Sequence, residues 1–178
     1  MAQNNKEQND YKVTYYNTVS SRTVEWLWYP YIPYGKITIL QGDPGEGKST
    51  MMIQLAALVT TGKAMPDGSG DKVPGNVIYQ AAEDGIEDTI KPRLVAAGAD
   101  CGRIAFLEND ENPITLDDER LEQAINDTQA RLLVIDPLQA YLGVDNDMQK
   151  SNSTRSVFGR LAKVAERTGC AVVLIGHM

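Results

Sequence analysis

Gly42-Asp-Pro-Gly-Glu-Gly-Lys-Ser49 is the stretch that decides the fold of this 178-residue chain. It matches the pattern G-x-x-x-x-G-K-[ST], a glycine-rich loop whose backbone N–H groups surround a phosphate. The run 36–41 before it has the length and β-branched content of a strand, and apolar spacing over 50–60 predicts a helix after it. A strand, a glycine loop and a helix in this order are the context that phosphate binding requires.

We therefore expect the loop to bind a nucleoside triphosphate, ATP, together with Mg²⁺. Lys48 would contact the β- and γ-phosphates and so take part in catalysis, and Ser49 would hold Mg²⁺. The partial positive charge of the helix N-terminus adds to the attraction. The expected nucleotide-binding residues are Gly42, Asp43, Pro44, Gly45, Glu46, Gly47, Lys48, Ser49 and Thr50.

Composition narrows the class of protein. Seventeen basic residues against 24 acidic residues give a net charge of −7, so no overall basic field draws the chain to nucleic acid or membrane. The polar first ten residues do not form a signal peptide, and no apolar run is long enough to span a bilayer. Cys101 and Cys170 are expected to be two buried thiols in a reducing cytoplasm rather than a disulfide.

The chain beyond the loop alternates strands with helices. Nearly unbroken apolar strands in such an order predict a single α/β domain with a parallel sheet buried on both faces. Residues 1–23 are expected to be disordered or extended, and residues 24–178 to form the domain. The aromatic stretch 24–34 is interpreted as an apolar strap over one sheet edge, or else as a subunit contact or adenine-side platform. Further strands are expected at 76–82, 103–108, 131–136 and 170–175, and helices at 86–98, 117–128 and 154–167.

Polar residues at three strand ends are the remaining site candidates, because ligands of open parallel sheets bind at the carboxyl ends of the strands. Asp136 ends an apolar strand and is expected to orient Mg²⁺; the alternative is a turn before Pro137. Glu83 is expected to orient and activate the attacking water, while its neighbour Asp84 fits a helix cap better. His177, the one histidine, is expected to contact the γ-phosphate; the alternative is a structural role.

With these motifs in place, the chain resembles the RecA-type ATPases. Gly42–Ser49, Ala81-Ala-Glu-Asp-Gly85, Leu132-Leu-Val-Ile-Asp-Pro-Leu-Gln139 and Leu174-Ile-Gly-His-Met178 occur in the family's order, with most likeness to RepA-like hexameric helicases of plasmids and phages and related AAA-type ATPases. The resemblance implies catalysis by Glu83, a Walker B aspartate at Asp136 and a γ-phosphate sensor at His177. It also implies the sheet order third, second, fourth, fifth, first. Pro137 stands where AAA+ proteins in the narrow sense carry a catalytic acid, which favours the RecA type.

The resemblance also implies features beyond residue 178. RecA-type proteins continue with further strands, a DNA-binding loop and, in hexameric helicases, an arginine finger, so we expect a C-terminally truncated core and a homo-hexamer at full length. Single-stranded or duplex DNA would bind through those later segments, since the loop after Asp136 carries Asp145, Asp147 and a single lysine, Lys150. Three functions stay open: a replicative helicase, a RecA/RadA-like recombination or repair ATPase, and a nucleotide-switched regulatory ATPase that acts on proteins without DNA.

Overall fold

A five-stranded parallel sheet forms the centre of the computed structural model, which describes residues 12–70, 72–108, 112–143 and 151–177. The strand order is β3-β7-β6-β4-β5. This is the order predicted from the resemblance, read from the other side. The strands are β3 (Ile37–Gly42), β4 (Asn76–Ala81), β5 (Ile104–Ala105), β6 (Ala130–Asp136) and β7 (Ala171–His177).

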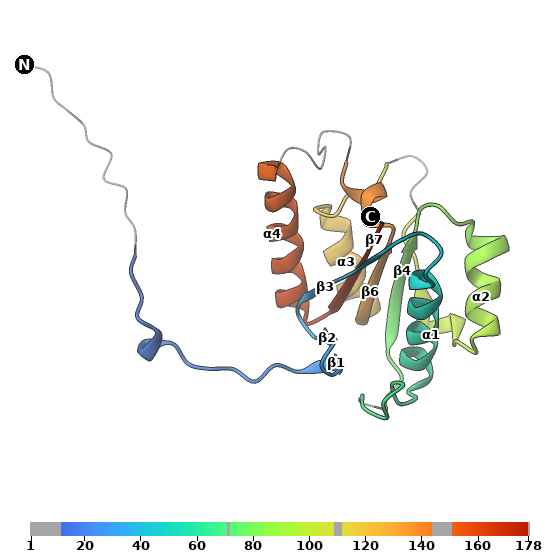
Figure 1. Ribbon diagram of the computed structural model, residues 1–178, viewed down its shortest axis with the longest axis horizontal. Coiled ribbons are helices and arrows are strands. Elements are labelled where there is room, and N and C mark those ends of the chain that lie inside the picture. The colour runs from blue at the N-terminus through green and yellow to red at the C-terminus, as the bar shows by residue number, and fades with distance from the viewer. Residues whose placement is uncertain (1–11, 71, 109–111, 144–150, 178) are drawn as a thin grey trace, which may run out of the picture.

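Two hydrophobic cores cover the two faces of this sheet. Side chains alternate along each strand, so β6 sends Leu132 and Val134 into one core and Leu133 and Ile135 into the other. Helices α1 (Lys48–Thr61) and α2 (Lys91–Ala96) cover the first face, and α3 (Glu119–Thr128) and α4 (Ser151–Thr168) cover the second (Figure 1). The central strands are therefore buried on both sides, as their apolar runs predict.

The same alternation places the ends of the strands. The core that packs against α1 is called the α1 core, and it contains residues 132 and 134 of β6 and residues 171, 173 and 175 of β7. By the same two-residue alternation, Asp136 and His177 lie on the α1 face. Register brings these ends together, because Gly42 pairs with His177 and Ala81 with Asp136. The carboxyl ends of β3, β7, β6 and β4 therefore lie at the same end of the sheet, where α1 begins (Figure 1).

Local boundaries differ from the expectations in two places. The predicted third strand, 103–108, pairs with β4 only over Ile104–Ala105; beyond it, the Leu107 backbone hydrogen-bonds to the side chain of Gln80 instead of the β4 backbone. The predicted helix 86–98 begins as a π-helix over Ile86–Ile90 before α2, whose first turn accommodates Pro92. Cys101 is exposed and Cys170 is buried; both thiols are free, so the expectation of two buried thiols was wrong for Cys101.

The N-terminal segment leads away from the sheet. Every residue from 12 to 25 is exposed, with one short 3-10 turn at Tyr16–Thr18 (Figure 1). The aromatic stretch then forms an antiparallel hairpin of β1 (Trp26–Trp28) and β2 (Ile32–Pro33). Leu27 and Ile32 are buried in the α1 core at the amino ends of the strands, so the stretch does cover apolar surface there, although Tyr29 and Tyr31 stay exposed.

No helix in the described part of the chain is both long and apolar enough to cross a bilayer. The loop after Asp136 that holds Asp145, Asp147 and Lys150 lies outside the described residues, as does residue 178.

Candidate nucleotide-binding site

The glycine-rich loop joins β3 to α1 at the carboxyl end of the sheet. Gly45 and Gly47 have φ angles of 84° and 83°, in the left-handed region that disfavours residues with a Cβ. A Cβ on either would meet no atom within 4 Å, so the backbone conformation and not crowding calls for glycine. Gly47 caps α1 without a side-chain hydrogen bond, which leaves the first N–H groups of the helix for a ligand.

Lys48 lies across this loop with its stem buried. The side chain is 8% exposed, and its Nζ donates to the carbonyl oxygens of Gly42 at 2.8 Å and Asp43 at 2.6 Å. Glu46 closes the other side of the turn by accepting from the Asp43 N–H at 2.9 Å. The structure therefore places the predicted loop residues in one backbone turn that carries the Lys48 ammonium group, an arrangement suited to a phosphate chain.

Asp136 ends β6, which β7 separates from β3 in the sheet, and is also 8% exposed. Its Oδ2 accepts a hydrogen bond from the Tyr79 hydroxyl at 3.1 Å, and Oδ1 makes no hydrogen bond to the described part of the chain. Burial and the negative charge of Asp136 raise the pKa of Tyr79 well above its usual value, so this hydroxyl stays a donor.

The donor set suits Mg²⁺. Mg²⁺ in phosphate-binding enzymes uses one or two protein ligands and completes its shell with phosphate oxygens and water. Asp136 offers one carboxylate oxygen, and Ser49 at the start of α1 offers a hydroxyl. Within the described residues, no group of three or more His, Cys, Asp or Glu side chains could hold a metal ion.

Glu83 and His177 come from different strands and meet at this end of the sheet. His177 Nε2 lies 3.9 Å from Glu83 Oε2. The Glu83 side chain is 68% exposed and can turn toward a ligand, whereas His177 is 31% exposed. The structure thus brings together the two residues expected to activate water and to contact the γ-phosphate.

Asp84 has a partner of a different kind. Its carboxylate forms a 3.0 Å ion pair with Arg93 of α2. The expected helix cap is not formed, because Gly85 occupies the N-cap position and no side chain makes a capping hydrogen bond there. Asp84 is therefore paired with α2, which leaves Glu83 as the acid facing His177.

Tyr79 and Gln139 belong to the site but were not found from the sequence. Gln139 lies in the 3-10 turn Leu138–Tyr141, and its side-chain N–H donates to the His177 backbone oxygen at 2.9 Å. Gln139 Oε1 and His177 Nδ1 are buried without a hydrogen-bond partner among the described residues. The alternation of side chains, combined with the implied strand order, could have placed Tyr79 on the same face as Asp136.

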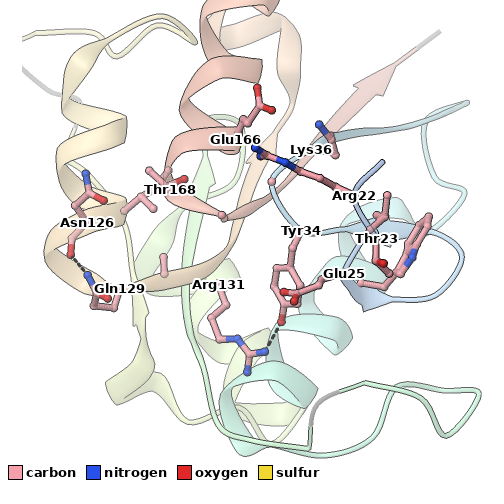
Figure 2. Close-up of a pocket in the computed structure, with 16 residues that line it drawn as sticks. Arg22, Thr23, Glu25, Tyr34, Lys36, Asn126, Gln129, Arg131, Glu166 and Thr168 are labelled. Atoms are coloured by element: carbon pink, nitrogen blue, oxygen red, sulfur yellow. Dashed lines mark hydrogen bonds between the residues drawn. The ribbon is translucent and has the colours of Figure 1, made fainter. Parts of the chain in front are cut away.

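A cavity lies at the opposite end of the sheet. It has a volume of about 1100 Å³ and is lined by residues at the starts of β3, β6 and β7, among them Lys36, Arg131 and Gly169. Figure 2 shows the Tyr34 hydroxyl facing the Arg131 guanidinium, which donates a hydrogen bond to it, and Gln129 bonded to Asn126. This amino-end cavity contains none of the predicted site residues.

Comparison with known proteins agrees with this geometry. The family described as "AAA domain" matches residues 9–178. The DNA repair protein RadA of Halalkalibacterium halodurans is 26% identical over 146 residues, which cover 81% of this chain and 28% of the relative. RadA of Mycobacterium tuberculosis strain H37Rv is 26% identical over 147 residues, and RadA of Bacillus subtilis 25% over 146, each covering 81% of this chain. The chain spans 27% and 28% of those two relatives. With its P-loop, parallel sheet and strand order, the chain belongs to the AAA domain family and has the fold of a RecA-like P-loop ATPase.

Proposed function

We propose that this domain binds ATP with Mg²⁺ and hydrolyses it to ADP and phosphate. The observation that carries the proposal is the approach of Glu83 and His177, 3.9 Å apart, beside a phosphate loop whose helix N–H groups have no side-chain cap. A carboxylate, an imidazole and an ammonium group then surround the place where a γ-phosphate would lie. Catalysis of phosphoryl transfer depends on such positioning and charge.

Each residue has a separate task in this reaction. Glu83 accepts a proton from water as the water oxygen forms its bond to the γ-phosphorus. The bond from that phosphorus to the β–γ bridging oxygen breaks, and ADP leaves with the electron pair. Lys48 neutralises charge on the phosphate oxygens, and the His177 side chain contacts the transferred group. Mg²⁺, held through Ser49 and Asp136, would supply further neutralisation of that charge when bound.

The proposed biological role is that of a DNA-dependent motor domain acting in DNA repair or recombination. The similarity to proteins named DNA repair protein RadA supports this role at least as well as it supports a RepA-like replicative helicase. In this role the protein would bind DNA and form a homo-oligomer such as a hexamer.

The test uses the full-length protein and measures phosphate release with and without single-stranded DNA. A DNA-dependent motor is expected to release phosphate faster when DNA is present. Strand displacement on a forked duplex then separates a helicase from a repair ATPase, because a repair ATPase need not displace a strand. Absence of phosphate release under both conditions would contradict the proposed hydrolysis.

A regulatory ATPase that acts on protein partners without DNA is the second candidate. The net charge of −7 favours it, since an acidic surface repels the phosphate backbone of DNA. Phosphate release that proceeds but does not respond to DNA at any salt concentration would support this candidate over the motor.

A further inference from the structure

A buried hydrogen bond links the expected metal ligand to the neighbouring strand. The Tyr79 hydroxyl of β4 donates to Oδ2 of Asp136 on β6 at 3.1 Å. Both side chains lie on the α1 face, and they are 2% and 8% exposed. Water therefore has little access to this bond, and the ring of Tyr79 is held by the surrounding core.

This bond leaves the two oxygens of the Asp136 carboxylate unequal. Oδ2 accepts from Tyr79, whereas Oδ1 makes no hydrogen bond to the described residues. A metal ion, or a water molecule bound to it, can thus reach the carboxylate through one oxygen without breaking a buried hydrogen bond. Binding through both oxygens would make the metal share Oδ2 with the Tyr79 hydroxyl and would weaken that hydrogen bond.

The two common divalent cations differ in what they take from a carboxylate. Ca²⁺ accepts carboxylates through one oxygen or both, in flexible shells of six to eight ligands. Mg²⁺ needs near-octahedral geometry and keeps several waters, so it uses a carboxylate through a single oxygen or through water. Partners that orient a metal ligand affect the affinity of the metal strongly.

We propose that Tyr79 is a positioning residue that favours binding of Asp136 through its free oxygen, and thereby favours Mg²⁺ over Ca²⁺ as the partner of ATP. The inference rests on the proposed function, since it specifies the metal of the same site. It assigns Tyr79 a role that is more than packing, because a phenylalanine would fill the same core equally well.

Tyr141 provides a matched control. It is a second buried tyrosine, 1% exposed, but it packs in the core on the other face of the sheet. Its hydroxyl has no hydrogen-bond partner among the described residues. Tyr141→Phe therefore removes a buried hydroxyl that makes no hydrogen bond to Asp136.

The experiment measures ATP binding by the full-length protein while MgCl₂ or CaCl₂ is titrated, and compares the half-saturating concentrations of the two metals. Tyr79→Phe should raise the half-saturating Mg²⁺ concentration roughly tenfold, the lower end of effects seen for residues behind a metal ligand, and raise that of Ca²⁺ less. The preference for Mg²⁺ over Ca²⁺ should then shrink, while Tyr141→Phe should keep the wild-type preference. Replacement of Tyr79 by 4-aminophenylalanine, which retains a hydrogen-bond donor, should restore the preference for Mg²⁺.

Three results would overturn the proposal. An unchanged preference for Mg²⁺ in Tyr79→Phe would do so, as would an equal loss in Tyr141→Phe, which would show general loosening of the core. If the wild-type protein bound no ATP with either metal, the proposed function would fail together with this inference. If the wild-type protein binds ATP and Tyr79→Phe keeps the same preference for Mg²⁺ over Ca²⁺, the inference about the metal is refuted while the proposed function stands.

Discussion

The two ends of the sheet differ in how their polar groups are used. At the amino end, the cavity is lined by groups that bond to one another, such as Arg131 with Tyr34. At the carboxyl end, Lys48 and Asp136 are nearly buried, and His177 Nδ1 has no hydrogen-bond partner among the described residues. Buried polar groups are costly unless they are paired or serve a ligand. The comparison teaches that a glycine loop gathered with charged side chains at the carboxyl end, and not the volume of a cavity, marks the candidate site.

Glu83→Gln should have the largest effect at the carboxyl end. An amide cannot take a proton from water, so turnover should fall by about 10²- to 10⁴-fold while ATP still binds with Mg²⁺. Phosphate release and equilibrium binding of ATP by the full-length protein measure the two quantities.

Asp84→Asn is the control for that change, because it removes a neighbouring acid that is paired with Arg93. Its turnover should stay close to that of the wild type. Full turnover in Glu83→Gln together with loss in Asp84→Asn would show that the wrong acid had been assigned.

Lys48→Ala should weaken ATP binding by roughly 100-fold, since the charge-assisted bonds to the phosphates are lost. Lys36→Ala at the amino-end cavity removes a lysine of the same charge and should leave the affinity unchanged. Titration calorimetry with ATP and Mg²⁺ compares the ATP affinities of the two variants. Equal affinity losses in the two variants would remove the distinction between the ends of the sheet.

His177→Ala should bind ATP almost normally but lose communication between the nucleotide and assembly. Its ring faces Glu83, and Gln139 holds its backbone. The ATP concentration that promotes assembly should rise by roughly tenfold, within the range of ordinary couplings between sites. Light scattering with increasing ATP measures this, and loss of the circular-dichroism spectrum in the variant would instead favour a structural role for the histidine.

Tyr34→Phe should have the smallest effect, and only on stability. It removes a hydrogen bond with Arg131 while the ring can still lie beneath the guanidinium, so we expect a loss of about 1 kcal/mol in the free energy of unfolding. Urea denaturation measures the loss. A change in ATP affinity without a change in stability would indicate that the amino-end cavity takes part in nucleotide binding.

Much of the fold follows from local patterns. The runs that became β3, β6 and β7 are nearly unbroken and apolar, and the glycine loop fixes where α1 begins. The strand order came from the resemblance and not from these patterns. The length of β5 and the π-helix at Ile86–Ile90 could not be predicted, because they depend on which neighbours a segment finds in space. The domain boundary at residue 24 stays a prediction.

The positions of the main residues in the candidate site could also be predicted, but the hydrogen bonds between them could not. Asp136, Glu83 and His177 were found because parallel strands end at one side of a sheet, and the structure does bring them to that side. Their chemical roles stay predictions. The bond between Tyr79 and Asp136 joins residues 57 positions apart and depends on register, which no local pattern gives.

A crystal structure of the full-length protein with a non-hydrolysable ATP analogue and Mg²⁺ tests most directly where the nucleotide binds. We predict that the triphosphate lies in the Gly42–Ser49 loop, with Lys48 at its β- and γ-phosphates and Glu83 and His177 beside the γ-phosphate. The amino-end cavity should hold no nucleotide. A triphosphate bound in that cavity, or one in the loop with Glu83 and His177 both turned away from the γ-phosphate, would contradict the proposed site.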